Sequence, residues 1–318
     1  MRYLIVGAGG TGGAFAAFLQ KAGLDVTLIA RGEHLRAIRE QGLRLELPES
    51  SFVVQPKAEN MPSYVRGRQD GSNPAPDVIL VCVKYYSLPE TISFLRAAAD
   101  SRSIIIPILN VYGTGSRMQA ELPELMVTDG CMYIVSRKAA PGVIRMDGPL
   151  FRVVYGLRQN TPAEARAKAE PVLEQADKEL GQAGIQVVHS RQVEDDTFRK
   201  FTLISPMATL GAVYDTKARD MQPGGAHREE FAALAGELAA LAAALGISLP
   251  QDIVAKNLHI IDHMAPDSTA SMQRDVAAGR ESEVDGLVHA VVRMADEAGI
   301  QVPHYQELAE ILSKRGVQ

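Results

Sequence analysis

The stretch that most limits the fold is a glycine-rich hexapeptide near the start of the chain, Gly7-Ala8-Gly9-Gly10-Thr11-Gly12. The apolar residues 3–6 before it predict a buried parallel strand, and residues 14–22 after it predict a helix that ends at Gly23. Residues 25–30 predict a second strand. Strand, glycine turn, helix and strand follow one another within about 30 residues, which is the order of a βαβ unit.

This glycine pattern, G-x-G-x-x-G, predicts a turn that binds phosphate. Gly7 permits a tight turn, Gly9 lets a pyrophosphate approach the backbone, and Gly12 lets the helix pack closely on the strand. The exposed N–H groups and the positive end of the helix dipole then attract the phosphate charge. We therefore expect residues 7–12 to bind a dinucleotide; the alternative is a glycine turn with a purely structural role.

The end of the second predicted strand indicates which dinucleotide is bound. A site that prefers NAD has Asp or Glu there, and this side chain bonds the ribose 2′-hydroxyl. This chain instead has Ala30 followed by Arg31. A guanidinium can pair with a 2′-phosphate through two hydrogen bonds, whereas a carboxylate would repel it. We expect NADP, with Arg31 at its 2′-phosphate; the alternative is that Arg31 is a solvated loop cation.

Composition argues against several classes of function. Of the 318 residues, 46% are hydrophobic and 22% are charged, as in globular proteins. A net charge of −5 without a Lys/Arg-rich run argues against a nucleic-acid surface. The longest apolar runs, residues 78–83 and 104–109, are too short to cross a bilayer. With no signal peptide ahead of the first strand, and with Cys82 and Cys131 expected as buried thiols, we predict a cytoplasmic protein.

Two more buried strands, predicted at residues 77–84 and 104–110, end at Lys84 and Asn110. Ligands of open α/β sheets collect at the carboxyl ends of the strands, so both side chains are candidates for a site. Ordinary polarity at the end of a strand would explain them equally well. The polar residues 64–76, which precede the first of these strands, predict a surface loop.

The character of the chain changes near residue 190. Before it, we predict antiparallel strands at residues 130–136, 142–146 and 150–156, a helix at 162–183 and a strand at 185–188. After it, we predict alanine-rich helices that include residues 229–245, 256–263 and 285–298. The expected class is α/β, with a Rossmann-type dinucleotide-binding domain at residues 1–190 and an all-helical domain at 191–318. The two domains would form a cleft, and the helical domain could mediate a homodimer.

A second set of motifs is spread along the chain. It comprises the opening glycines, Arg31-Gly32, His34-Leu35, Gln41-Gly42-Leu43, Lys84, Asn110 before Gly113, Pro141-Gly142-Val143 and Arg199-Lys200. The most specific member is S-M-x-x-D-x-x-x-G-R-x-x-E-x-D-G at residues 271–286. In these motifs the chain resembles, over nearly its full length, the ketopantoate reductase (2-dehydropantoate 2-reductase) family.

The resemblance implies reduction of a 2-oxo acid, 2-dehydropantoate, by NADPH to a 2-hydroxy acid, (R)-pantoate, for the synthesis of pantothenate and coenzyme A. It implies that Lys200 donates a proton to the carbonyl oxygen and that Glu283 orients the oxygen groups of the substrate. Asn110 would lie near the nicotinamide and the carbonyl, and Ser271 would bond the substrate carboxylate. Lys84 would position these anions by its charge; Lys84, Asn110 and Glu283 would also contact the cofactor.

Phe198 stands where the family often has Trp, and three further positions lack a usual amide. Ile204 and Ala208, four and eight residues after Lys200, and also Ser268, stand where amide side chains are usual. Ser205 would replace an amide only if the helix register shifted by one residue. Sites that bond a hydroxyl discriminate strongly by that bond, so a different 2-oxo acid is one alternative substrate. An alternative of another class is a regulatory NADP-binding protein without catalysis.

One histidine pair has a spacing that can bind a metal. His259 and His263 stand one helical turn apart. A third ligand with a supporting spacing is missing from the sequence, and the resembled family uses no metal. We therefore expect a structural role for the pair and no metal site.

Overall fold

The computed structural model describes residues 1–317, which form two compact units. The first unit comprises Met1–Val83, Ser87–Leu109 and Gly113–Val193. The second comprises the chain from Glu194 onward together with two short segments, Lys84–Tyr86 and Asn110–Tyr112. The two short segments follow strands of the first unit in sequence, yet they pack as part of the second.

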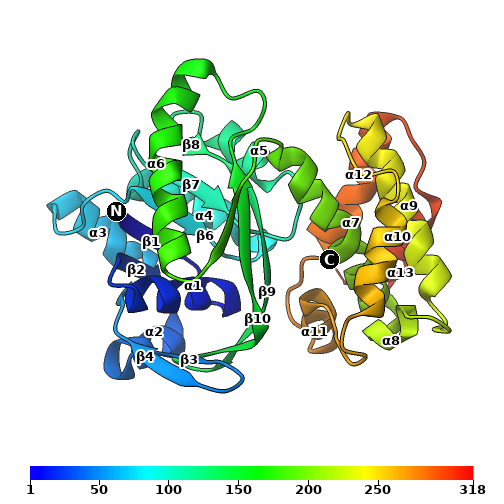
Figure 1. Cartoon of the computed structure of the whole chain (residues 1–318), viewed down its shortest axis with the longest axis horizontal. Helices are drawn as coiled ribbons and strands as arrows, with labels where there is room; N and C mark the ends of the chain where they lie inside the picture. The colour runs from blue at the N-terminus through cyan, green and yellow to red at the C-terminus, as the bar shows by residue number, and fades with distance from the viewer. Residues whose placement is uncertain (318) are drawn as a thin grey trace. The chain divides into compact units, whose positions relative to one another are not determined.

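A parallel sheet forms the centre of the first unit (Figure 1). Its strands lie in the order β5-β2-β1-β6-β7-β8, and all neighbouring strands are parallel. These strands are β1 (Arg2–Val6), β2 (Asp25–Ile29), β5 (Lys57–Glu59), β6 (Val78–Val81), β7 (Ile104–Pro107) and β8 (Met126–Val127). The helices between them are α1 (Gly10–Lys21), α2 (Gly32–Gln41), α3 (Met61–Asp70), the 3₁₀ turn η1 (Tyr85–Ser87), α4 (Leu88–Ala98) and α5 (Thr114–Glu121). Strands β6 and β7 are buried along their whole length, which explains their continuous apolar runs.

A second, mixed sheet completes the first unit. Its strands lie in the order β11-β10-β3-β4, and β9 pairs with β10 as a long antiparallel hairpin. They are β3 (Leu43–Glu46), β4 (Ser51–Val54), β9 (Asp129–Ala140), β10 (Val143–Gly156) and β11 (Gln186–His189). Helix α6 (Ala163–Gln182) connects β10 to β11, and these two strands are parallel. The unit therefore has two sheets.

Helix α1 contacts strands of both sheets. Its small residues allow this close packing, since a Cβ on Gly13 would come within 2.5 Å of the Ile144 side chain. Phe15 and Phe18 of α1 meet the Phe151 ring edge-on, with centroids 5.1 and 4.9 Å apart. One continuous apolar core thus joins the two sheets through the helix that begins at the glycine turn.

The second unit is helical and has its own core. Its elements are α7 (Val193–Tyr214), α8 (Ala218–Met221), α9 (Arg228–Ala244), α10 (Ile253–Asp262), α11 (Ser271–Ala277), the π-helix η2 (Asp285–His289), α12 (Ala290–Ala298) and α13 (Pro303–Lys314). Phe198 and Phe201 of α7 are buried in this core together with Phe231 and Tyr305. The apolar faces of alanine- and leucine-rich helices need only each other to be buried.

The predicted α/β class with a helical C-terminal part is confirmed. The loop predicted at residues 64–76 is wrong for residues 64–70, because α3 occupies Met61–Asp70, whereas residues 71–76 form no helix or strand. The Asn60 side chain caps this helix by accepting a hydrogen bond from the Ser63 N–H, and Gly71 ends it in the left-handed conformation. The strands predicted separately at 142–146 and 150–156 are one strand, β10, with an irregularity between Met146 and Phe151.

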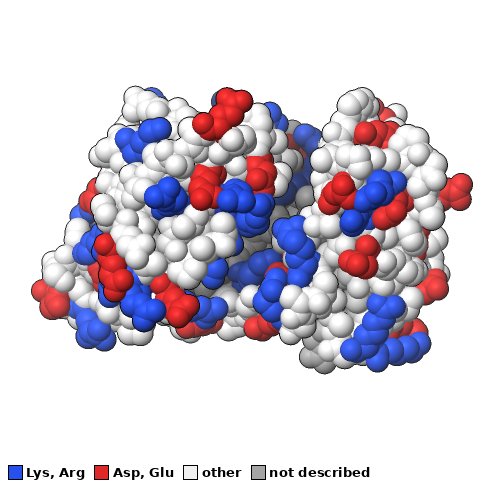
Figure 2. Space-filling view, turned by 90° about the horizontal axis from the view of Figure 1, so that it is seen from below, with Lys and Arg blue, Asp and Glu red and all other residues white. Residues whose placement is uncertain are grey.

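Charge is mixed over the surface. On the face shown in Figure 2, Lys and Arg side chains are interspersed with Asp and Glu. This pattern agrees with the small net charge of −5. Within residues 1–317, every helix is too short or too polar to pass through a lipid bilayer.

Candidate active site

The glycine turn between β1 and α1 has room for a ligand where the sequence predicts it. Gly7 has a φ of +101°, and a Cβ on Gly12 would lie 2.0 Å from the Gly7 carbonyl oxygen, so both positions require glycine. By contrast, a Cβ on Gly9 would meet no atom within 4 Å. The backbone at Gly9 is therefore open to an approaching group.

The start of α1 is suited to an anion. Gly9 is its N-cap and supplies no side-chain hydrogen bond, and the first turn contains no acidic residue. N–H groups of this turn are left without a capping side chain, at the positive end of the helix dipole. The turn thus fits the pyrophosphate of a dinucleotide on its own chemistry.

Arg31 follows β2 and is the N-cap of α2. It is exposed, and within residues 1–317 its guanidinium takes part in no hydrogen bond or ion pair. The nearby carboxylate of Glu59, whose carbonyl accepts the Ala30 N–H, is held by Lys57 at 3.1 Å and by Asn73 at 3.2 Å. Within residues 1–317, Arg31 is therefore a cation without a protein partner, whereas the Glu59 carboxylate already has two.

Lys84 is the centre of a charged cluster in the helical unit. Its Nζ lies 2.8 Å from Glu283 Oε2, 3.2 Å from Asp275 Oδ2 and 3.4 Å from Ser271 Oγ. Glu283 is only 3% exposed, and its second oxygen accepts the Tyr85 N–H at 3.2 Å. A buried carboxylate with these two donors is fixed in place.

The electrostatics of the cluster keep Lys84 charged. Burial opposes the ammonium form, but the negative charges of Glu283 and then Asp275 outweigh it and raise the pKa of Lys84. Asp275 is in turn bound by Arg280, whose Nη2 lies 2.8 Å from Oδ1. At neutral pH Lys84 therefore remains an ammonium, in a cluster where it and Arg280 balance the two carboxylates Glu283 and Asp275.

A second pair joins Lys200 and Asn110. Lys200 lies on α7 and is 7% exposed, and its Nζ donates to Asn110 Oδ1 at 2.8 Å. Asn110 belongs to the short segment after β7 that packs with the helical unit. This hydrogen bond orients the buried Lys200 ammonium toward the Asn110 carboxamide.

The structure thus groups five of the predicted site residues within the helical unit: Lys84, Ser271 and Glu283 in one cluster, and Lys200 with Asn110 in a pair. Residues 7–12 and Arg31 lie in the first unit. The prediction assigned no role to Asp275, although it stands four residues after Ser271 and so shares a face of α11 with it. The i, i+4 spacing from Ser271 could have identified Asp275 as a neighbour of the site.

The residues that depart from the family pattern have distinct surroundings. Ile204 is half-buried and Ala208 is buried, and their spacing from Lys200 places all three on one face of α7. Ser205 does not replace an amide. Its Oγ donates to the Leu287 carbonyl at 2.6 Å and lies 2.6 Å from the Tyr305 hydroxyl, both deep in the helical core.

His259 lies in the last turn of α10, and His263 is its C-cap. The rings of His259 and His263 are 4.3 Å apart, and His263 Nδ1 lies 2.7 Å from the His259 carbonyl oxygen. Among residues 1–317, no three His, Cys, Asp or Glu side chains are grouped as metal ligands.

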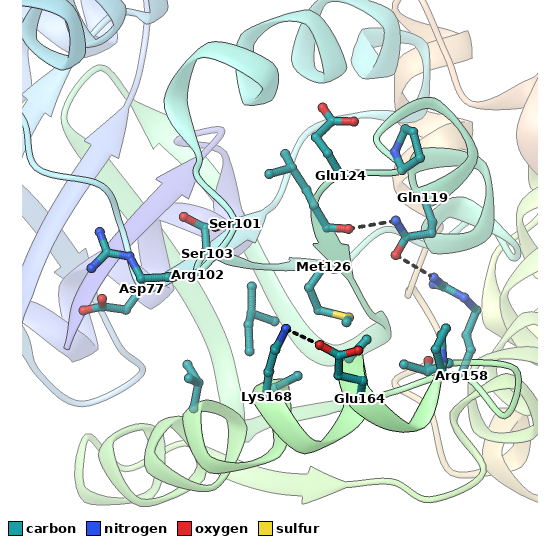
Figure 3. A pocket seen from close by; sticks show the side chains of 18 of the residues that line it. Asp77, Ser101, Arg102, Ser103, Gln119, Glu124, Met126, Arg158, Glu164 and Lys168 are labelled. Atoms are coloured by element: carbon teal, nitrogen blue, oxygen red, sulfur yellow. Dashed lines mark hydrogen bonds and ion pairs between the residues drawn. The ribbon is translucent and has the colours of Figure 1, made fainter.

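A groove of about 1100 Å³ beside β8 and α6 is separate from these residues (Figure 3). Its wall includes Gln119, whose Nε2 donates to the Leu125 carbonyl and whose Oε1 accepts the Val127 N–H. The Gln119 amide therefore covers the edge of the parallel sheet as a further strand would. Arg158, also on this wall, donates from Nη2 to Gln119 Oε1 at 3.2 Å.

Two family models match nearly the whole chain. The family model described as "Ketopantoate reductase PanE/ApbA" matches residues 3–160, and "Ketopantoate reductase PanE/ApbA C terminal" matches residues 192–316. The 2-dehydropantoate 2-reductase of Halobacterium salinarum is 25% identical over 316 residues, which cover 98% of each chain.

Solved structures of similar proteins share the fold of this chain. A PanE/ApbA family ketopantoate reductase from Ralstonia eutropha JMP134 is 26% identical, with a TM-score of 0.84 over 99% of this chain and 100% of that one. D-mandelate dehydrogenase in complex with NADH and anilino(oxo)acetate shares the fold at 19% identity, with a TM-score of 0.84 over 99% of this chain and 98% of that one. The two family models together span both units, and the chain belongs to the ketopantoate reductase family of oxidoreductases.

Proposed function

We propose that the protein reduces 2-dehydropantoate to (R)-pantoate with NADPH, as a step toward pantothenate and coenzyme A. The observation that carries this proposal is the pairing of two lysines with different partners: Lys200 with a neutral amide and Lys84 with two carboxylates. We assign proton donation to the buried Lys200 ammonium, which donates a hydrogen bond to Asn110, and we assign the lasting positive charge to Lys84, whose pKa its two carboxylates raise. Reduction of an anionic 2-oxo acid needs both.

When bound, the reduced nicotinamide supplies a hydride to the 2-oxo carbon. Lys200 Nζ donates a proton to the carbonyl oxygen as negative charge develops there, and its lost proton is replaced from solvent. The Asn110 carboxamide holds that ammonium in position through its Oδ1 at 2.8 Å. One hydride and one proton are added, which converts the C=O group to CH–OH.

The Lys84 cluster would bind the acid end of the substrate. Ser271 Oγ donates to the substrate carboxylate, and the Lys84 ammonium at 3.4 Å from it attracts the same charge. Glu283 holds Lys84 in place and orients the oxygen groups of the substrate. We propose that residues 1–190 bind the dinucleotide and that residues 191–318 supply most of these substrate contacts.

NADPH is proposed over NADH because of Arg31. Its guanidinium has no partner within residues 1–317, and no carboxylate stands at the end of β2. A 2′-phosphate would give this cation a partner, whereas a 2′-hydroxyl would not.

A second candidate substrate is a 2-oxo acid with an apolar side chain. Ile204, one turn beyond Lys200 on the same face of α7, is half-buried and apolar. A hydroxyl of 2-dehydropantoate would find no hydrogen-bonding partner in that side chain, whereas an alkyl or aryl group would bury apolar surface against it.

The test is oxidation of NADPH and of NADH by the purified protein, with 2-dehydropantoate and a panel of alkyl and aryl 2-oxo acids. Higher kcat/KM for 2-dehydropantoate supports the first proposal. Higher kcat/KM for an apolar panel member moves the substrate and retains the reaction. Binding of NADPH without turnover of any 2-oxo acid would refute the catalytic proposal and favour a regulatory NADP-binding protein.

A further inference from the structure

We propose that Gly286 is a positioning residue that sets the geometry of both lysine pairs. It lies on the π-helix η2, three residues after Glu283. This inference rests on the proposed function for its kinetic consequences, but its structural consequence can be measured independently.

Gly286 touches both short segments that pack with the helical unit. A Cβ built on it would lie 2.5 Å from Val111 Cγ2 and 2.9 Å from Tyr85 Cδ1. Val111 follows Asn110 and Tyr85 follows Lys84 in the chain. A single added methyl group would therefore push against the neighbours of both site residues at once.

The glycine is required for space and not for its backbone conformation. Its φ is outside the left-handed region, so any residue could adopt the backbone at this position. Glycine within a helix is less favourable than alanine, because it loses more backbone freedom on folding. Its presence here is explained by the close approach of the two segments.

The two segments cannot move aside freely. Val111 is 5% exposed in the helical core, and the Tyr85 N–H is bonded to Glu283. Next to Val111, the Tyr112 ring packs edge-on against Phe198 with centroids 4.7 Å apart. Carbon atoms need a separation of about 3.5–4 Å, so a methyl group at 286 requires a shift of about 1 Å in one or both segments.

Such a shift would disrupt the site. Both Lys84–Glu283 and Lys200–Asn110 are at 2.8 Å, and an increase of about 1 Å places either pair outside hydrogen-bond distance. A misplacement of this size can reduce the rate about 100-fold. The substitution Gly286→Ala is therefore expected to act on the lysine pairs through Val111 and Tyr85.

Gly236 offers a matched control. It lies within α9, and a Cβ on it would meet no atom within 4 Å. Gly236→Ala adds the same methyl group within a helix, at a position where it meets no other atom. The double variant Gly286→Ala/Val111→Ala removes the two Val111 methyl groups and leaves Tyr85 Cδ1, at 2.9 Å, as the one close neighbour of the new Cβ. It is the variant to measure if Gly286→Ala alone does not fold.

The experiment measures kcat and KM for the 2-oxo acid, the melting temperature and the titration of Lys84, followed by ¹³C NMR of the lysine Cε. We expect Gly286→Ala to lower kcat about 100-fold and to bring the pKa of Lys84 back toward its ordinary value. The Val111→Ala change should restore at least tenfold of the lost rate. Gly236→Ala should leave kcat, KM and the titration unchanged.

Two outcomes would overturn the inference. One is a kcat of Gly286→Ala within twofold of that of the unsubstituted protein. The other is an identical Lys84 titration in Gly286→Ala and in the unsubstituted protein. If the unsubstituted protein reduces no 2-oxo acid, the proposed function fails. The NMR titration then still decides whether Gly286 positions Lys84.

Discussion

Replacement of Lys200 by methionine tests the proposed mechanism most directly. Methionine retains the apolar stem in this buried position but removes the ammonium that donates to Asn110 at 2.8 Å. Proton donation by a positioned group contributes about 10²–10⁴ in rate. The expected loss in kcat therefore corresponds to about 2.7–5.4 kcal/mol of transition-state stabilisation.

Asn110→Ala should cost less than Lys200→Met. It keeps the acid but removes the acceptor that orients it, and a hydrogen bond to a charged group contributes about 1.5–3 kcal/mol. If Asn110 acts only through Lys200, the double variant Lys200→Met/Asn110→Ala should be hardly slower than Lys200→Met alone. Single-turnover oxidation of bound NADPH is the suitable assay, because it excludes product release.

Lys256→Met is the control, since Lys256 is exposed on α10 and, among residues 1–317, forms its ion pair with Asp252, the N-cap of that helix. Its kcat should be unchanged. The mechanism would be refuted by a Lys200→Met protein that keeps its melting temperature and loses less than tenfold in kcat. Strict additivity of the two single losses would refute the statement that Asn110 acts through Lys200.

Three further predictions concern cofactor choice, packing and pH. Arg31→Ala should weaken binding of NADPH by about 1.5–3 kcal/mol and leave that of NADH nearly unchanged; equal losses measured by calorimetry would contradict the 2′-phosphate assignment. Ser205→Ala should destabilise the protein by about 1–3 kcal/mol in urea unfolding without altering KM, because its hydroxyl bonds Leu287 and Tyr305; a changed KM would place it in the site. The prediction on pH concerns His189. A hydrogen bond to Asp177 raises its pKa above 6.5, so this stabilisation is present below pH 6.5 and is lost as pH rises through the folded-state pKa. The stability difference between the unsubstituted protein and His189→Gln should therefore shrink at alkaline pH, and a constant difference would disprove the linkage.

Local sequence was sufficient for the glycine turn and the elements around it. Residues 7–12 require glycine because of a positive φ at Gly7 and a 2.0 Å approach at Gly12, and both requirements arise within one βαβ unit. The buried strands were also predictable, because a strand covered on both faces must be apolar along its length. Where local chemistry and polarity disagreed, prediction failed. The polar residues that follow Asn60 suggested a loop, but the capping side chain of Asn60 and the buried Tyr64 make a helix there.

The tertiary structure decided which side chains meet. Lys84 and Glu283 are 199 positions apart in the chain, and Lys200 and Asn110 are 90 apart, so no periodicity within one element could pair them. The same holds for Ser205, whose hydroxyl turns into the core because Tyr305, 100 positions away, lies buried beside it. Propensity and capping act over a few residues, whereas these contacts depend on how separate helices pack. The sequence by itself therefore determined the class of fold and the residues available for chemistry, and packing determined which of them act together.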